Sequence, residues 1–150
     1  MRGKKLICFD YGEKRIGVAV GQTLTATASP LETISVRNGK PDWHRISALI
    51  DQWRPQALIV GRPLCMDGSR QPLTNLTGKF VRQLKGRYHL PVHYEDERLS
   101  SYEARQRQKN RNDQLDAIAA QVILESWLAE NTKITTSNAK MHGSYSPENE

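Results

Sequence analysis

"CFDYGEKRIGVAVG", residues 8–21, decides the fold of this 150-residue chain. An apolar run ends at Asp10, the chain turns through residues 11–15, and a second apolar run follows. Because side chains alternate between the two faces of a strand, the second run places Ile16, Val18 and Val20 on one face. Its other face carries only glycine and alanine, which leaves room for a helix or a ligand to approach closely. The stretch therefore predicts two paired strands with a carboxylate beside their turn.

In the rest of the chain, apolar periodicity predicts three more strands and four helices. The expected strands cover residues 5–10, 15–21, 31–36, 57–61 and 91–97. The expected helices cover residues 41–54, 73–88, 100–109 and 114–130. Short connections predict an antiparallel meander for the first three strands, while a helix before each of the last two predicts parallel crossovers. The expected fold class is α/β, a mixed five-stranded sheet flanked by helices.

The length of the chain suits one domain, which we expect to span residues 1–130. Residues 131–150 lack apolar periodicity and are rich in Ser, Thr, Asn and Gly, so we expect a disordered tail there. Cys8 and Cys65 show no metal-binding spacing, no apolar run is long enough to span a membrane, and no secretory signal is evident. We therefore expect a reduced, cytoplasmic protein with no membrane partner.

A formal net charge of +6 is compatible with a polyanionic partner, although such a surplus also serves solubility alone. Basic residues gather in the turn beside Asp10 and after the last expected strand. We expect the following side chains to contact nucleic-acid phosphates: Lys14, Arg15, Arg98, Arg105, Arg107, Lys109 and Arg111. Lys79, Arg82 and Lys85 recur at helical spacing and are better explained as a solvated helix face.

Three carboxylates lie at the ends of expected elements. Asp10 closes the first strand, Glu97 closes the last, and Asp116 lies in the first turn of the final helix. If the fold gathers them, a hard cation such as Mg²⁺ or Mn²⁺ would relieve their repulsion, and one or two such ions would activate water against a phosphodiester. Each acid also has an ordinary explanation: an Asx turn for Asp10, helix-start electrostatics for Asp116, and a surface pair with Arg98 or Lys14 for Glu97. The pattern alone does not show that the three converge.

Four blocks of the chain together resemble the YqgF family, the pre-16S rRNA nucleases also called Holliday-junction-resolvase-like proteins. The blocks are "FDYGEKRIGVAVG", "IVGRPLCMDGS", "DERLSSYEA" and "LDAIAAQVILESWL", and the similarity runs from Leu6 to Leu128. The resemblance implies an RNase H-like fold, with Asp10, Glu97 and Asp116 as the catalytic and metal-ligating residues. It also implies a metal-dependent nuclease that processes the 5′ end of pre-16S rRNA.

Other functions stay open at this point. The family pattern has a longer connection before the last aspartate than residues 106–115 provide, which puts substrate choice in question. A Holliday junction resolvase acting on DNA and a non-catalytic RNA-binding ribosome-assembly factor are the alternatives. An actin-like or sugar-kinase ATPase begins in a similar way, but 150 residues are too few for its two lobes. We expect a nucleic-acid partner, either pre-ribosomal RNA or a DNA junction, and a monomer or weak dimer.

Overall fold

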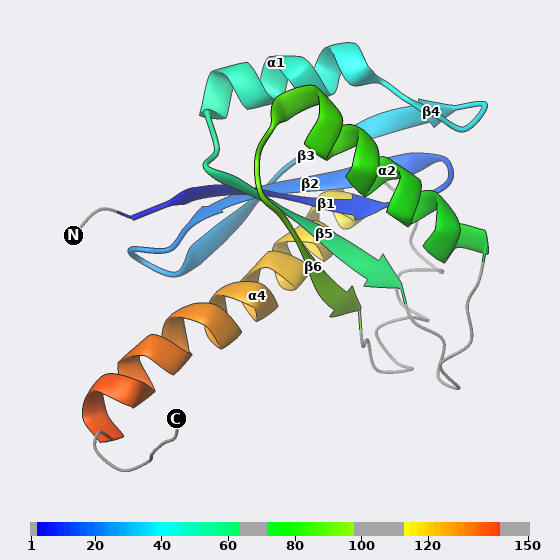
Figure 1. The fold of residues 1–150 in the computed structure, drawn as a ribbon. Helices are drawn as coiled ribbons and strands as arrows, with labels where there is room; N and C mark the ends of the chain where they lie inside the picture. The colour runs from blue at the N-terminus through cyan, green and yellow to red at the C-terminus, as the bar shows by residue number, and fades with distance from the viewer. Residues whose placement is uncertain (1–2, 64–71, 98–112, 142–150) are drawn as a thin grey trace.

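A computed structural model describes residues 3–63, 72–97 and 113–141, apart from the side chains of residues 62–63, 72–74, 96–97, 113–115 and 133–141 (Figure 1). Six strands form one sheet in the order β4-β3-β2-β1-β5-β6. The strands are β1 (Lys5–Tyr11), β2 (Arg15–Gln22), β3 (Thr27–Arg37), β4 (Lys40–Pro41), β5 (Ala57–Pro63) and β6 (Val92–Glu97). The helices are α1 (Trp43–Trp53), α2 (Pro72–Tyr88) and α4 (Asp113–Met141).

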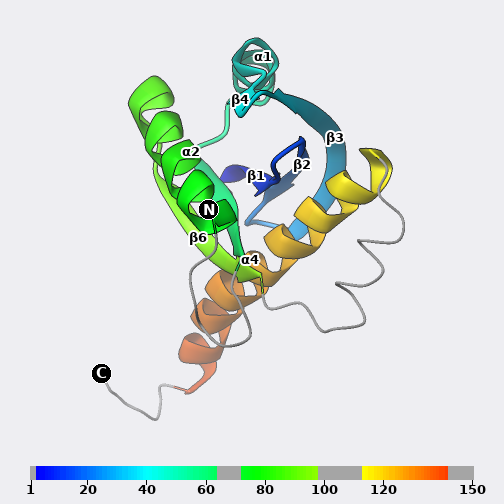
Figure 2. The same ribbon diagram turned by 90° about the vertical axis from the view of Figure 1, so that its right-hand side faces the viewer.

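The pairing of the strands confirms the expected mixed sheet. Strands β1, β2 and β3 are antiparallel neighbours, β5 is parallel to β1, and β6 is parallel to β5. Because β1, β5 and β6 run in one direction, their carboxyl ends lie at the same edge of the sheet, which faces the reader in Figure 2. Helices α1 and α2 cover one face of the sheet, and α4 covers the other (Figure 1).

The sheet separates two hydrophobic clusters of different character. The cluster beneath α1 and α2 is built from large side chains, among them Phe9, Ile46 and Phe80. The cluster beneath α4 contains small side chains, among them Cys8 and Ala19. The glycine and alanine face of β2 therefore receives a helix, as the sequence predicts, because little side-chain volume separates the strand from α4.

The tryptophans belong to the core faces, which confirms their interpretation from the sequence. Trp43 and Trp53 pack against the cluster beneath α1 and α2, and Trp127 packs against the cluster beneath α4. The ring of Trp43 lies 5.6 Å from that of Phe80, centroid to centroid. None of the three is therefore a free platform for stacking a base.

The sheet has six strands where we expected five, and the additional strand is β4. It pairs with the end of β3 through Val36 opposite Pro41 and Arg37 opposite Lys40. The two residues between the strands, Asn38 and Gly39, both have positive φ, 54° and 74°. Asn-Gly is the preferred sequence for such a two-residue hairpin turn. The expectation was wrong because Pro41 was assigned to the start of the helix, whereas it ends a strand and α1 begins at Trp43.

The third strand is longer than residues 31–36, because β3 begins at Thr27 and runs through Pro30. A register shift opposite Val18 and Ala19 accommodates the proline, which pairs with Ala19 while Glu32 pairs with Val18. A bulge of this kind is a usual place for a proline inside a strand. The helix expected over residues 100–109 lies outside the described residues.

Helix α4 continues to Met141, eleven residues past the point where we expected the folded part to end. Among its described side chains, which end at Thr132, the last buried one is Leu128, and local hydrogen bonds follow: Asn131 and Thr132 each donate from the side chain to the carbonyl four residues earlier. No proline or glycine interrupts residues 129–141. The division into a domain and a disordered tail stays a prediction. None of the helices in the described ranges combines the length and apolar content needed to cross a membrane.

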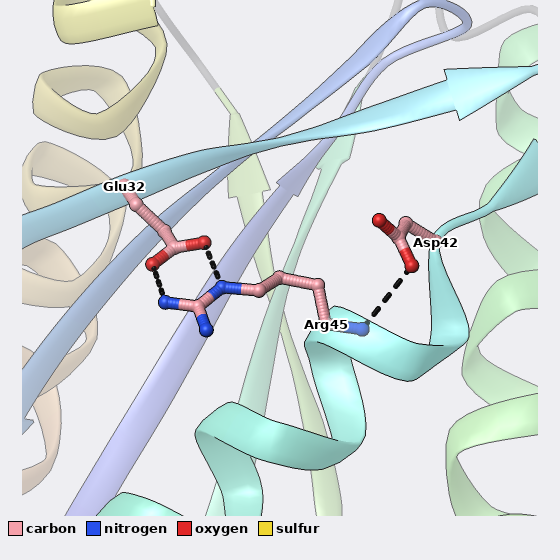
Figure 3. A network of polar contacts seen from close by, with 3 residues as sticks. All are labelled: Glu32, Asp42 and Arg45. Atoms are coloured by element: carbon pink, nitrogen blue, oxygen red, sulfur yellow. Dashed lines mark hydrogen bonds and ion pairs between the residues drawn. The ribbon is translucent and has the colours of Figure 1, made fainter.

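Polar contacts fix the start of α1 on the sheet (Figure 3). The side chain of Asp42 caps the helix by accepting a hydrogen bond from the backbone N–H of Arg45 at 3.2 Å. The guanidinium of Arg45 donates twice to the carboxylate of Glu32 on β3, at 2.7 and 2.5 Å. This hydrogen bonding raises the pKa of Arg45 above its ordinary value. The cap stabilises the first turn of α1, and the ion pair joins that turn to β3.

Replacing Asp42 with Ala should lower the free energy of unfolding by about 0.5–2 kcal/mol, because it leaves an N–H of the first helical turn without its acceptor. Urea denaturation followed by circular dichroism measures the change. Asp51→Ala is the matched control, since Asp51 is exposed in the last turn of the same helix and makes no cap. Equal midpoints for the two variants would contradict the assigned cap.

Candidate functional site

Asp10 lies one residue before the end of β1, on the face that α4 covers. It alternates along the strand with Leu6 and Cys8, both buried beneath α4. Only 7 % of Asp10 is exposed, although it is a carboxylate. Tyr11 points to the other face, where its ring packs 4.9 Å from that of Phe80, and burial, followed by the charge of Glu13, raises the pKa of its hydroxyl. The acid rather than the phenol therefore faces the candidate site.

A backbone contact brings Asp116 to the same place. Gly17 of β2 pairs directly with Asp10 of β1, an arrangement that sets their Cα atoms about 4.5–5.5 Å apart. The first turn of α4 rests on this glycine, so that a Cβ atom at residue 17 would lie only 1.9 Å from the carbonyl oxygen of Asp116. Gly17 therefore lies between the backbone of Asp10 and the backbone of Asp116, two of the three expected acids.

Arg15 completes this part of the site. It precedes Gly17 by two residues and so shares the face of β2 toward α4. Its Nε donates to Oδ2 of Asp116 at 2.6 Å, and the two side chains are 33 % and 26 % exposed. The expected phosphate contact of Arg15 remains a prediction, and in this structure its guanidinium is paired with a carboxylate.

Glu97 is the last residue of β6 and pairs in register with Pro63 at the end of β5. Since β1 and β6 are both parallel to β5, Glu97 and Asp10 lie at the same carboxyl edge of the sheet. The side chain of Glu97 is outside the described residues. The structure thus brings Asp10 and Asp116 together and sets the backbone of Glu97 at their edge, while the catalytic and metal-binding roles of the three stay predictions.

Glu95 is a buried acid that the sequence analysis did not select. It pairs with Gly61 of β5, and continuing the register of β1 and β5 by one residue places Gly61 beside Asp10. Only 7 % of Glu95 is exposed, whereas His93, two residues earlier, is exposed and stacks its ring 5.5 Å from that of Trp127. The alternation of side chains along the strand places Glu95 on the same face as His93 and Glu97, but this pattern does not reveal that Glu95 is buried.

Only some of the basic residues singled out in the sequence lie in the described part of the chain. Lys14 is exposed in the turn between β1 and β2. The backbone carbonyl of Lys14 accepts a hydrogen bond from the N–H of Val36 at 2.9 Å, and this bond holds the turn against β3. Lys79, Arg82 and Lys85 are exposed on α2, as expected of a solvated face. The other expected phosphate contacts lie outside the described residues: Arg98, Arg105, Arg107, Lys109 and Arg111.

The donor chemistry of the site suits a hard divalent cation. Asp10 and Asp116 offer carboxylate oxygens, the ligands that Mg²⁺ and Mn²⁺ prefer. Asp116 already neutralises a positive charge, that of Arg15. No group of three or more His, Cys, Asp or Glu side chains that could hold a metal occurs among the described side chains, a set that leaves out Glu97. The residues present therefore fit the cation without showing a complete site.

Replacing Gly17 with Ala should lower the free energy of unfolding by at least about 1–3 kcal/mol, because the new methyl group must displace the first turn of α4. Urea denaturation measures the loss. Gly86→Ala is the matched control: a Cβ atom at residue 86 would meet nothing within 4 Å, so alanine there should raise stability by about 0.5–1 kcal/mol. A Gly17→Ala protein as stable as the parent would refute the close seating of α4.

A mixed sheet of this order, with two helices on one face and a long helix across the other, is an RNase H-like fold. Residues 4–130 match the model of the family described as "RuvX: Holliday junction resolvase". The chain belongs to this family.

Curated relatives cover most of the chain and share the provisional name pre-16S rRNA nuclease. The protein of Hydrogenovibrio crunogenus is 50 % identical over 123 residues, which are 82 % of this chain and 92 % of that protein. The protein of Pseudomonas putida is 47 % identical over 135 residues, 85 % of this chain and 96 % of the relative. That of Azotobacter vinelandii is 46 % identical over 138 residues, 87 % and 97 % of the two chains.

Solved structures of two resolvases share the fold. Thermus thermophilus RuvC in complex with a Holliday junction substrate has a TM-score of 0.51 and 16 % identity, covering 86 % of this chain and 97 % of that one. The fowlpox virus resolvase in complex with Holliday junction DNA has a TM-score of 0.52 and 16 % identity, covering 84 % and 97 %. At this level of identity the similarity shows the RNase H-like fold alone.

Proposed function

We propose that this chain is a nuclease that hydrolyses phosphodiester bonds during 5′-end processing of pre-16S rRNA, with Asp10, Glu97 and Asp116 at its active site. The observation that carries the proposal is the contact of Asp116 with Gly17, the residue paired with Asp10. Membership of the family supports phosphodiester chemistry, and the names of the relatives support the ribosomal RNA substrate.

The three acids would hold one or two Mg²⁺ or Mn²⁺ ions. Such a cation, when bound, supplies positive charge that offsets the negative charge developing on the phosphate. The protein's own contribution is to hold the carboxylates in place before the ligand arrives. Asp10 stands on a strand with neighbours on both sides, and a backbone contact positions Asp116, so neither acid depends on a flexible loop.

Basic residues would bind the phosphates that flank the cleaved bond. Lys14 is exposed in the turn that follows Asp10, and Arg15 lies between that turn and Asp116. Arg98 and the cluster of Arg105, Arg107, Lys109 and Arg111 would extend this surface after β6. Such contacts position the backbone of a nucleic acid and carry no base sequence. We place this activity in the cytoplasm and assign the protein as a monomer or weak dimer.

Replacing Asp10 with Asn should reduce cleavage by more than about 100-fold, a loss greater than is typical of residues that only support a metal ligand. Asparagine keeps the shape of the side chain and removes its charge. The rate of cleavage of structured RNA in Mg²⁺ or Mn²⁺ is the measurement, and circular dichroism checks the fold. Asp51→Asn, an exposed site on α1, is the matched control and should cleave like the parent. Undiminished cleavage by Asp10→Asn would refute the assignment.

A Holliday junction resolvase acting on DNA is the second candidate, because the description of the matched family names that activity. Purified protein is incubated with RNA carrying the pre-16S 5′ end, single-stranded RNA, duplex DNA and a four-way DNA junction, in Mg²⁺, Mn²⁺ or chelator. We expect metal-dependent cleavage of the structured RNA and an intact junction. Paired nicks in the junction would favour the resolvase. RNA binding without cleavage would favour a non-catalytic ribosome-assembly factor.

A further inference from the structure

The ion pair between Arg15 and Asp116 joins the two kinds of residue that the proposed function needs, a phosphate-binding cation and a metal-binding carboxylate. Arg15 stands at the start of β2 and Asp116 in the first turn of α4, 101 positions apart in the chain. Their Nε–Oδ2 distance of 2.6 Å is that of a strong, charge-assisted hydrogen bond. The pair therefore forms part of the site itself.

This contact puts arginine and a metal ion in competition for one carboxylate. The guanidinium of Arg15 is a cation that offers hydrogen-bond donors and no acceptor, so it is attracted to the same carboxylate as a metal ion. A dication bound to the carboxylate of Asp116 would repel the guanidinium of Arg15, which contacts Oδ2 of the same group. Binding of a metal ion at Asp116 therefore disfavours the contact of Arg15 with Asp116, and that contact disfavours binding of the metal ion.

The side chain of Arg15 is only partly enclosed by the protein. One third of its surface is exposed, so it is not enclosed by the contact with Asp116. It adjoins the exposed turn that carries Lys14 and follows Asp10. A guanidinium released there presents a planar set of donors at the edge of the site, an arrangement that suits a phosphate group.

We propose that Arg15 is the counter-ion of Asp116 before metal binds, and that the metal ion displaces it onto a phosphate of the nucleic acid, so that the two ligands bind cooperatively. This inference rests on the proposed function. Cooperativity follows because each ligand favours the state in which Arg15 has left Asp116, and such coupling is reciprocal. Arg15 thus contacts Asp116 in the metal-free state and a phosphate of the nucleic acid in the state with both ligands bound.

A purely structural role for Arg15, that of joining α4 to β2, makes the opposite prediction for metal binding. If the pair only held Asp116 in place, its loss would misplace the carboxylate and weaken the metal. If Arg15 is a competitor, its loss removes a positive charge from the site and strengthens the metal. The sign of the change in metal affinity therefore separates the two roles.

The first measurement is Mn²⁺ binding to the full chain by isothermal titration calorimetry, without nucleic acid. Arg15→Gln should bind Mn²⁺ about fivefold more tightly than the parent, or more, at the lower end of typical coupling factors. Lys79→Gln is the control for net charge, since Lys79 is exposed on α2 across the sheet, and it should bind within about twofold of the parent. Equal or weaker binding by Arg15→Gln overturns the proposal.

The second measurement is the affinity of a labelled 2′-O-methyl phosphorothioate oligonucleotide, which resists hydrolysis, by fluorescence anisotropy. Mn²⁺ should tighten its binding to the parent by about fivefold or more, and should change its binding to Arg15→Gln by less than about twofold. An equal effect of Mn²⁺ on both proteins overturns the proposal.

The fold and the proposed function are tested separately from the coupling. Circular dichroism checks that Arg15→Gln is folded; if it is not, Arg15→Met decides, since methionine also removes the charge, and it too must bind Mn²⁺ more tightly than the parent. A parent protein that binds Mn²⁺ and cleaves RNA, with a variant that shows unchanged coupling, rejects the inference alone. A parent protein that neither binds Mn²⁺ nor cleaves any substrate rejects the proposed function and the inference together.

Discussion

The contact between the first turn of α4 and Gly17 is the constraint on which the rest of the site depends. It is a backbone contact, because a Cβ atom at residue 17 would lie 1.9 Å from the carbonyl oxygen of Asp116. The helix can approach the sheet this closely because Gly17 has no side chain, and small residues such as Ala19 and Ala120 lie among the leucines and isoleucines of the cluster beneath it. Since glycine occupies the position beside Asp10, the closest approach of α4 falls where the acids are. The glycine and alanine face of β2 thus determines both how α4 packs on the sheet and where Asp116 lies relative to Asp10.

Local patterns in the sequence account for most of the fold. Alternation and apolar runs predicted the meander, the two parallel strands and the helices α1, α2 and α4, because each depends on neighbours a few positions apart. The missed strand β4 also had a local signal, the Asn38-Gly39 turn, but it competed with a helix start at Pro41 and Asp42. Both signals are real: the turn ends in Lys40 and Pro41, and Asp42 caps α1.

The site was less accessible from the sequence, because it depends on contacts between distant parts of the chain. The three acids could be selected by their places at the ends of elements, yet the expectation that they converge required the resemblance to a family. No local pattern could pair Arg15 with Asp116, which are 101 positions apart. The burial of Glu95 depends in the same way on neighbours from other elements, since its own surroundings in the sequence are charged and exposed in character.

Helix α4 is much longer than the surface it packs against. At a rise of 1.5 Å per residue its 29 residues extend about 43 Å, and its far half projects past the sheet in Figure 1. Among the described side chains of the helix, which end at Thr132, the last buried one is Leu128, and the match to the family model ends at position 130. Asp116 stands at the opposite end of the helix from Met141, so a change in the length of the projecting end would leave the position of that carboxylate unaltered.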